Sequence, residues 1–433
     1  MFGSLNPSKR FDTFWYHRKP RFWFQKDRPR PEGHRETPEV VRFEVEPGVT
    51  PSDKPPVRIF LGTEPFQARA ERVFFWSVKQ HRDPSRVYEI YLMKDLKGYD
   101  RRGWKTGFTF LRFAIPGLAG YQGRAIYNDV DQIYLSDPAE LFDADMGGKG
   151  MLAITATDDS VMLIDCEVMA KHWPLQDVQR EGAIKKRFRN AVKDNDLWGR
   201  LPGVWNARDD EFDAAKSKCF HFTTLQTQPW RPFPDQLIYR SHPDGEVWFA
   251  LERAADAARY NGFSREKPGS RFAAYLQRVG NGLPAWGGPK DNAEIMRLIS
   301  SSGAKTVLDY GAPAPDGAAR PFAGCEVARL EPGRAPFAEP VAGTFDGVVA
   351  VDALSRVPEE DIPWALDELF AAAKRFVYVS VASEPSRMGD GAAPLPATWW
   401  KLQMELAANR TPGRSWALAA NEPNATEVFR SGK

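Results

Sequence analysis

Cysteine is scarce in this chain of 433 residues, which contains only Cys166, Cys219 and Cys325. The three residues lie far apart, and none of them forms a Cys-x-x-Cys pair. An odd and sparse set of thiols argues against a disulfide framework and for a reducing compartment. We therefore interpret all three as inert side chains and expect a cytoplasmic protein.

Long hydrophobic runs and a dominant charge sign are also missing. No stretch of about 18 apolar residues occurs, so no transmembrane helix is expected, and the N-terminal MFGSLNPSKRF lacks the apolar segment of a secretory signal. The chain has 59 basic and 57 acidic residues, a net charge of +2, which gives no reason to expect a nucleic-acid partner. With 42% apolar and 27% charged residues, the composition is that of a globular protein long enough for two domains.

Residues 1–56 are predicted to form a basic, aromatic tail. Aromatic and cationic residues alternate from Phe11 to Phe24, and prolines from Pro20 to Pro51 interrupt any regular element. One hypothesis is peripheral contact of residues 11–30 with the inner face of a membrane, where aromatic rings and cations meet lipid headgroups. The alternative is an arm that packs on its own domain or on a partner subunit.

Two α/β units are predicted downstream. Residues 57–268 alternate apolar strands, at 57–61, 87–93 and 125–127, with amphipathic helices, and this rhythm favours a sheet with ligand sites at the carboxyl ends of its strands. Residues 269–290 are rich in proline and glycine and read as a linker with a helix at 271–278. Residues 291–433 repeat the α/β pattern, with strands at 306–309, 345–351 and 376–381 and a helical face from Ile362 to Phe370.

An Asp-x-Asp triplet is the strongest chemical signal in the first unit. Three such triplets occur, beginning at Asp129, Asp143 and Asp194, so the spacing alone is weak evidence. Only Asp129-Val-Asp131 directly follows an apolar strand, where carboxylates face the ligand crevice of a sheet. Two carboxylates at this spacing can hold a hard divalent cation that bridges the phosphates of a nucleotide-sugar.

Seven segments in the right order resemble the glycogenin-like retaining glycosyltransferases of family 8, which have the GT-A fold. The resemblance covers roughly residues 57–235. Its segments are Arg58–Glu64, Thr109–Phe113, Gly123–Asp131, Asp158–Asp165, Asp194–Leu197, Leu201–Asn206 and His221–Trp230.

This resemblance implies a site for a UDP-linked sugar and for Mn²⁺ or Mg²⁺, with transfer that retains the anomeric configuration. It implies three groups of residues. The metal ligands are Asp129, Asp131 and His221; residues near the nucleotide are Thr63, Glu64, Arg112 and Gln228; residues near the sugar or acceptor are Asp158, Asp159 and Asn206, with Asp194 and Asn195 as sugar-orienting residues in the catalytic position. A neutral imidazole beside two carboxylates suits Mn²⁺ better than an all-oxygen set does.

Three departures from the family pattern bear on the chemistry. Gln228 stands where the family has a phosphate-binding lysine, and it can donate a hydrogen bond but cannot neutralise charge. Asn195 replaces a glutamine, and Asp158 with Asp159 replaces Asn-Ala near the sugar. We expect an altered donor or acceptor, because the metal ligands are all present.

The second unit resembles Rossmann-like S-adenosylmethionine methyltransferases in degenerate form. Thr306–Gly311 and Phe345–Leu354 match the first and fourth strand motifs of that family, and Glu331 falls where an acid meets the ribose. Pro313 and Pro315 replace loop glycines, and proline removes both the conformational freedom and the N–H group. We therefore do not expect this unit to bind S-adenosylmethionine.

Three functional hypotheses remain at this stage. The first is a glycosyltransferase that acts on a glycan, lipid or protein acceptor. The second is a methyltransferase that acts on a glycan, against which the prolines count. The third is a non-catalytic nucleotide-sugar-binding or assembly protein, which would keep its role after loss of Asp129 and Asp131.

Overall fold

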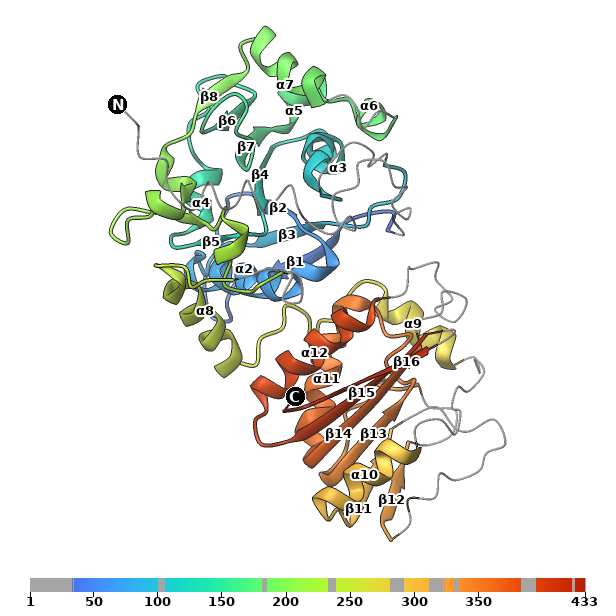
Figure 1. The fold of residues 1–433 in the computed structure, drawn as a ribbon. Coiled ribbons are helices and arrows are strands. Elements are labelled where there is room, and N and C mark those ends of the chain that lie inside the picture. The colour runs from blue at the N-terminus through green and yellow to red at the C-terminus, as the bar shows by residue number, and fades with distance from the viewer. Residues whose placement is uncertain are drawn as a thin grey trace. The chain divides into compact units, whose positions relative to one another are not determined.

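The chain folds into two compact units, residues Met1–Gly262 and Phe263–Lys433 (Figure 1). A computed structural model describes residue 33 and residues 35–99, 106–180, 185–232, 239–280, 292–310, 322, 324–330, 335–382, 395–422 and 425–432. The hypothesis of membrane contact through residues 11–30 lies outside these residues, as do residues 281–290 of the predicted linker and the predictions on Gly311–Pro315 and Glu331.

A seven-stranded sheet forms the centre of the first unit, with strand order β1-β3-β2-β4-β7-β6-β8. Strands β2, β3 and β4 are mutually parallel, whereas β1 and β7 are antiparallel to their neighbours β3 and β4. The strands are β1 (Glu39–Phe43), β2 (Val57–Gly62), β3 (Tyr88–Met93), β4 (Arg124–Asp129), β6 (Met151–Ala153), β7 (Val161–Asp165) and β8 (Trp198–Arg200).

Helices and 3-10 turns connect these strands in the α/β rhythm that the sequence predicts. They are η1 (Pro65–Gln67), α2 (Ala68–His81), η2 (Thr109–Ala114), α3 (Ile115–Leu118), α4 (Pro138–Phe142), α5 (Cys166–Ala170), α6 (Leu175–Arg180), α7 (Lys185–Asp194), η4 (Gly203–Trp205), η5 (Asp209–Glu211), η6 (Leu225–Thr227) and α8 (Gly245–Ala257). The predicted strands at 57–61, 87–93 and 125–127 are confirmed, and so is the apolar face of α2 with buried Val73, Phe74 and Val78. The mixed α/β class is therefore confirmed.

The segment predicted as a tail contributes an edge strand to this sheet. Strand β1 pairs with β3, with Val41 opposite Ile90 and Phe43 opposite Tyr88. Val41 and Phe43 are buried while Arg42 is exposed, which is the alternation of a half-buried strand. The expected tail is therefore shorter than residues 1–56; the prolines that flank this short strand masked its period.

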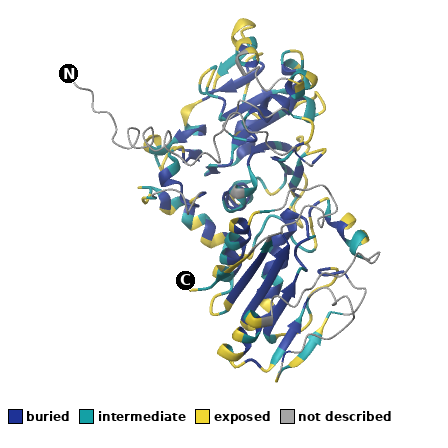
Figure 2. Cartoon of the chain, turned by 45° about the vertical axis from the view of Figure 1, so that its right-hand side comes forward, coloured by how far each residue is buried: buried dark blue, intermediate teal, exposed yellow. Residues whose placement is uncertain are grey.

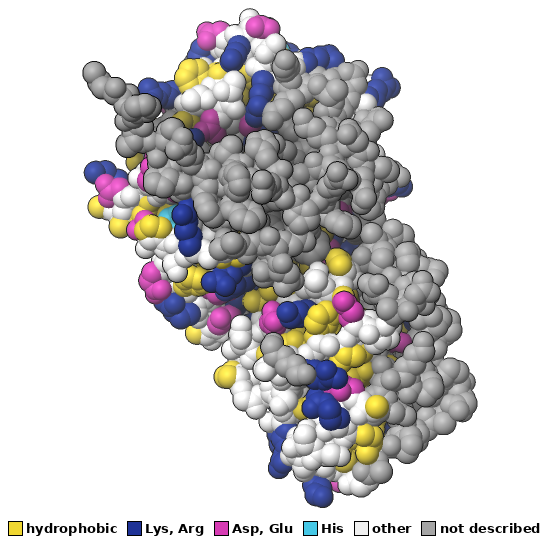
Figure 3. Space-filling model, viewed as in Figure 1, with side chains coloured by type: hydrophobic (Ala, Val, Ile, Leu, Met, Phe, Trp, Pro, Cys, Tyr) yellow, Lys and Arg dark blue, Asp and Glu magenta, His cyan; other side chains and the backbone are white. Residues whose placement is uncertain are grey.

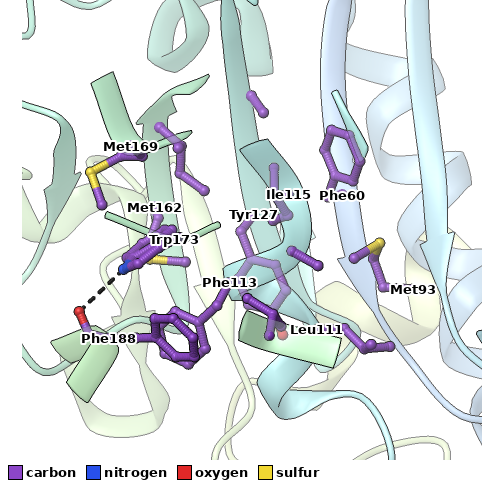
Figure 4. Close-up of a cluster of buried hydrophobic side chains, with 14 of the residues drawn as sticks. Phe60, Met93, Leu111, Phe113, Ile115, Tyr127, Met162, Met169, Trp173 and Phe188 are labelled. Carbon is purple, nitrogen blue, oxygen red and sulfur yellow. Dashed lines mark hydrogen bonds between the residues drawn. The ribbon is translucent and has the colours of Figure 1, made fainter. Parts of the chain in front are cut away.

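The core beneath β4 is apolar and aromatic, and it includes the ring of Tyr127. Figure 4 shows this ring among Leu111, Phe113 and Ile115, which come from η2 and α3. The Trp173 indole donates a hydrogen bond of 3.1 Å to the Phe188 carbonyl at the far end of the cluster. Burial follows the same pattern across the unit, with strands buried and helices exposed on their outer faces (Figure 2).

A small second sheet carries the other half of the candidate site. It has the order β5-β10-β9, with β5 (Gln132–Tyr134), β10 (Cys219–His221) and β9 (Ala207–Arg208). Antiparallel pairing sets His221 opposite Gln132, and the Phe222 amide donates to the Asp131 carbonyl at 2.9 Å. Residues distant in sequence are thereby brought beside the Asp-x-Asp triplet.

The second unit contains a six-stranded sheet of order β12-β11-β13-β14-β15-β16, parallel except for the last strand. Its strands are β11 (Thr306–Asp309), β12 (Glu326–Arg329), β13 (Phe345–Val351), β14 (Ala373–Ala382), β15 (Ser415–Glu422) and β16 (Ala425–Arg430). Its helices are α9 (Phe272–Gly280), α10 (Asn292–Ser302), η8 (Glu359–Asp361), α11 (Ile362–Ala372) and α12 (Ala397–Arg410). The predicted strands and the predicted helical face from Ile362 are confirmed.

Among the described residues, no helix is both long and apolar enough to cross a bilayer. On the face drawn in Figure 3, basic and acidic side chains of the described residues are interspersed rather than segregated. This distribution agrees with the near balance of charges in the sequence.

Gly62, the last residue of β2, offers a test of the packing around Tyr127. A Cβ atom at this position would collide with the Tyr127 hydroxyl and with the Phe108 ring, both of which are buried. We predict that Gly62→Ala lowers the free energy of unfolding of the first unit by about 1–3 kcal/mol, as overpacked cores do, measured by urea denaturation.

Gly203→Ala is the matched control, because nothing lies within 4 Å of a Cβ atom there. The control should change stability by less than about 0.5 kcal/mol. Equal stability of the two variants would contradict the close packing of Tyr127 against Gly62.

Candidate metal site

Asp129, Asp131 and His221 converge at the carboxyl end of β4. One ligand atom from each lies within 4.8 Å of the others, an arrangement that could hold a metal ion. Asp129 ends β4, Asp131 follows in the turn to β5, and His221 ends β10 in the small sheet. The structure therefore brings together the three residues that the sequence predicts as metal ligands.

His221 is oriented by Asn206, which follows η4. The His221 Nδ1 and Asn206 Oδ1 atoms lie 2.7 Å apart, and Asn206, with 1% exposure, also donates from Nδ2 to Ser160 Oγ at 3.0 Å. Since an amide oxygen only accepts, His221 Nδ1 must carry the proton, which leaves the Nε2 lone pair of the neutral ring facing the carboxylates. The sequence placed Asn206 near the sugar or acceptor, whereas the structure gives it this orienting contact.

The contact between Asp131 and His221 favours a cation at this place. His221 Nε2 lies 3.1 Å from Asp131 Oδ1, and this buried oxygen receives no hydrogen bond from the described residues. In the neutral ring two lone pairs then face each other, and only a cation or a proton between them removes the repulsion. Consistently, burial alone would lower the pKa of His221, but the Asp131 carboxylate raises it above its ordinary value. Two carboxylate oxygens and an imidazole nitrogen fit Mn²⁺.

Asp129 is held by a buried arginine and a buried tyrosine. Its Oδ1 accepts from Arg112 Nη2 at 3.0 Å and from the Tyr127 hydroxyl at 2.5 Å. Burial raises the pKa of Asp129 to about 6; Arg112 lowers it and the Asp131 carboxylate raises it further. The paired carboxylates are therefore costly without a cation, which is the state expected of a cation site.

Arg112 is buried, and its guanidinium group is hydrogen-bonded entirely within the protein. Its side chain is 4% exposed, and each of its five N–H groups has an acceptor. These acceptors are the Thr109 carbonyl, the Asp159 carbonyl, Asp159 Oδ1, the Tyr127 hydroxyl and Asp129 Oδ1. The resemblance placed this arginine toward the donor, but the structure shows a guanidinium already saturated by the protein.

Asp158 and Asp159 are both paired with arginines. Asp159, which is 7% exposed, accepts from Arg112 and also from Arg189 of α7, at 2.8 Å from Nε and 2.7 Å from Nη2. Asp158 accepts from Ser160 Oγ at 2.8 Å and from Arg208 Nη1 at 3.2 Å. Sequence reasoning missed Arg189, for which the only signal was its place on a basic helix two positions after Arg187.

Gln228 lies against the metal ligands. Its Nε2 donates to the Phe222 carbonyl at 2.9 Å and to Asp131 Oδ2 at 3.3 Å, while its buried Oε1 has no partner among the described residues. The amide therefore holds the Asp131 carboxylate rather than supplying the charge of a lysine. The Oε1 atom is placed to accept a hydrogen bond from a ligand or from water.

Thr63 and Glu64 follow β2 at the same edge of the sheet. The Thr63 hydroxyl is buried and donates to Glu71 Oε1 at 2.6 Å, and Glu71 is paired with Lys94 at 2.9 Å. Glu64 accepts from the Gly107 amide. The Thr63 side chain is therefore used within the fold, and the role of Thr63 and Glu64 near the nucleotide stays a prediction.

The structure does not bring Asp194 and Asn195 to the cluster, and their assignment as sugar-orienting residues is corrected. Strand β8 pairs parallel to β6, and β6 and β4 are both antiparallel to β7, so β8 runs in the same direction as β4. Residues just before β8 therefore lie at the amino edge of the sheet, opposite Asp129. Both side chains are exposed, and Asn195 donates only locally, to the Ala191 carbonyl at 2.8 Å.

The remaining Asp-x-Asp triplet is also separate from the site. Asp143 accepts from Arg86 and Lys54, and Asp145 accepts from the Gly147 amide in a surface turn. The preference for Asp129-Val-Asp131 on strand context is therefore supported by the geometry.

A second, partly buried anchor fixes the chain after His221, and the sequence did not reveal it. Asp209 accepts from the Thr223 amide at 3.0 Å, from the hydroxyls of Thr223 and Thr224, and from His242 Nε2 at 3.4 Å. Burial alone would raise the pKa of Asp209, but these hydrogen bonds, with His242 foremost, lower it to about 2. Asp209 thus stays ionised and holds the segment that leads to Gln228.

Comparison with known proteins gives partial similarities. No protein-family model matches the chain. A segment is 39% identical over 99 residues to protein CDI from Arabidopsis thaliana; it covers 21% of this chain and 38% of that protein, so the chain spans less than two fifths of the relative it matches.

Several solved glycosyltransferases are similar at low identity. The bifunctional WbbM matches with 13% identity and a TM-score of 0.33, over 47% of this chain and 53% of its own, about half its length. The galactosyltransferase LgtC, solved with donor and acceptor sugar analogues, matches with 10% identity and a TM-score of 0.32, over 46% of this chain and 96% of its own. GlyE of Streptococcus pneumoniae matches with 13% identity and a TM-score of 0.34, over 83% of this chain and 100% of its own. At these scores the similarities do not assign a function.

Removal of the Asn206 side chain tests its orienting role. We predict that Asn206→Ala weakens Mn²⁺ binding about 10- to 100-fold, as loss of an orienting partner of a metal-bound histidine does. Isothermal titration calorimetry of the full chain with MnCl₂ measures this directly.

Asn195→Ala is the matched control, because the same change is made at the exposed end of α7. It should leave Mn²⁺ affinity unchanged. Equal losses at both positions would restore Asn195 to the site and contradict the placement of Asn206.

Proposed function

We propose that the chain is a metal-dependent glycosyltransferase that moves a sugar from a nucleotide-sugar, with UDP as the nucleotide, to an acceptor. The observation that carries the proposal is the convergence of Asp129, Asp131 and His221 at the carboxyl end of β4. The retaining outcome and the UDP base come from the sequence resemblance alone. The acceptor class, whether glycan, lipid or protein, is left open.

The sheet topology supports a nucleotide at this place. The chain passes from β2 to β3 on one side and then to β4 on the other side of β2, so the order reverses between β2 and β4. Open α/β sheets bind ligands outside the carboxyl ends of their strands at such a switch point. The switch point lies between Thr63 and Asp129, with the metal ligands on the β4 side.

The residues of the site have separable roles under this proposal. Asp129, Asp131 and His221 would hold Mn²⁺, which when bound supplies positive charge to the diphosphate as it leaves the sugar. Asn206 fixes the His221 ring, and Gln228 fixes the Asp131 carboxylate. Arg112 holds Asp129 in the ionised form and does not need to contact the donor.

We propose no activity for the second unit. The chain segments that would decide S-adenosylmethionine binding, Gly311–Pro315 and Glu331, lie outside the described residues. No observation in the described part of the second unit favours methylation over a supporting role.

Asp131→Asn tests the proposal with little damage to the fold. The change keeps the shape of the side chain and removes one charged ligand, and the partners of Asp131 among the described side chains, Gln228 and His221, are not those of Arg112. We predict that Mn²⁺-dependent hydrolysis or transfer from UDP-sugars falls at least about 100-fold, since the charge on the leaving diphosphate is no longer offset. Release of UDP is the measurement, with a panel of UDP-sugars.

Asp145→Asn serves as the control, because it makes the same change in another Asp-x-Asp triplet, at a surface turn. Its activity should equal that of the unaltered chain. The proposal fails if the unaltered chain neither binds UDP with Mn²⁺ nor turns over any donor. A product of inverted anomeric configuration by ¹H NMR would overturn retention only.

A further inference from the structure

We propose that Arg189 binds an anionic group on the transferred sugar, so that the donor is a nucleotide-linked uronic acid or another sugar that carries a carboxylate. This inference rests on the proposed glycosyltransferase function and specifies its substrate class. The evidence for it is the set of contacts among Arg189, Asp159 and Arg112, and the position of these residues relative to the metal cluster.

The topology separates the two ends of the donor. Under the proposed function the nucleotide would lie at the switch point between β2 and β4, and the sugar beyond the diphosphate would then extend from β4 toward the neighbouring β7. Asp158 and Asp159 directly precede β7, and Arg189 reaches them from α7. Arg189 therefore lies on the sugar side of the cluster.

In the described part of the chain, Arg189 makes no hydrogen bond or ion pair with the three residues of the cluster. It is linked to Asp129 through two intervening side chains, by hydrogen bonds of 3.0 Å from Arg112 to Asp129, 2.7 Å from Arg112 to Asp159 and 2.7 Å from Arg189 to Asp159. Groups bound directly to the cation would contact the cluster itself, at about 2 Å from the cation. We therefore assign Arg189 to a group on the sugar rather than to the diphosphate, and calorimetry with UDP and with complete donors separates the two.

Hydrogen-bonding capacity favours an acceptor-rich ligand. The Asp159 carboxylate is 9% exposed and already accepts from two guanidinium groups, and Asp158 accepts from Ser160 and Arg208. Neutral sugar hydroxyls donate as well as accept and need such acceptors to be open. Arg189 adds open N–H donors to this region, and an anionic group made only of acceptors satisfies them without needing a further acceptor from the protein.

Arg189 itself has the capacity to bind a carboxylate. Its side chain is 24% exposed, compared with 4% for Arg112. Asp159 occupies its Nε and one hydrogen of Nη2, and Nη1 has no partner among the described residues. Three of its five N–H groups are thus open, and the planar guanidinium matches the geometry of a carboxylate.

The charge count agrees with an anionic ligand. A divalent cation with Asp129, Asp131 and a neutral His221 has no net charge. Arg112 and Arg189 share the single carboxylate of Asp159, which leaves one positive charge in this trio. A sugar carboxylate would neutralise that charge.

The test is calorimetric and uses the full chain with saturating Mn²⁺. UDP, UDP-glucose, UDP-galactose, UDP-glucuronic acid and UDP-galacturonic acid are titrated in turn. We expect one uronate to bind at least about tenfold more tightly than its neutral counterpart. Arg189→Gln should weaken that uronate about 10- to 100-fold, the usual range for a hydrogen bond to a charged group, and leave UDP and the neutral donors within about twofold.

Two further variants sharpen the result. Arg189→Lys keeps the charge but loses the planar fork, so uronate affinity should fall to an intermediate value. Arg187→Gln is the matched control, because Arg187 lies on the same helix, is 59% exposed and pairs with Asp177. It should bind all ligands as the unaltered chain does.

Three outcomes would overturn the inference. One is equal affinity of the unaltered chain for uronates and their neutral counterparts. Another is an equal loss of UDP, neutral donors and uronates in Arg189→Gln, which would assign Arg189 to the diphosphate or to the fold. A third is an equal effect of Arg187→Gln. Failure of the proposed function is distinct from these, because UDP itself would then not bind with Mn²⁺.

Discussion

The buried guanidinium of Arg112 is the constraint on which the candidate site depends. Two carboxylates near each other in a buried place repel, and removing them from water costs further free energy. Arg112 offsets both costs at Asp129 and Asp159 at once, and its five hydrogen bonds leave no donor unpaired. Burial opposes the charge on Arg112, but the acidic groups around it raise its pKa above the ordinary value, so it stays charged.

A buried network of hydrogen bonds holds the His221 ring in place. From Tyr134 the hydrogen bonds run through Asn128, Gln132 and the Ser160 carbonyl, and from the Ser160 hydroxyl through Asn206 to the His221 ring. The members are buried or partly buried and come from both sheets, so the network joins the triplet to the strand that carries the histidine. A fully satisfied buried network favours one geometry, which a metal site requires.

Much of this arrangement could be predicted from the sequence. Strand context selected Asp129-Val-Asp131 from three triplets, because a buried strand that ends in carboxylates has a physical reason to face a ligand. The motif around His221 led to the third member of the cluster. The predictions that failed have a physical explanation as well. Asp194 and Asn195 match the amino acids of a family motif, but they come just before β8 and therefore lie at the amino edge of the sheet. Arg189 and Asp209 were missed because their partners, Asp159 and His242, are distant in sequence and only the fold brings them together.

Two of the three departures from the family pattern change the number of charged side chains around the candidate site. The site has one cation fewer at Gln228 and two carboxylates more at Asp158 and Asp159, changes that alone would make it strongly acidic. The structure pairs each added carboxylate with an arginine, Arg208 for Asp158 and Arg189 for Asp159. The two arginines thus offset the two carboxylates on the side of β7, whereas Gln228 leaves the side of Asp131 without the charge of a lysine. Under the proposed function, the three residues that would hold the cation follow the family pattern, while the charged groups on the side of β7 differ from it, and a difference there would change which donor is selected.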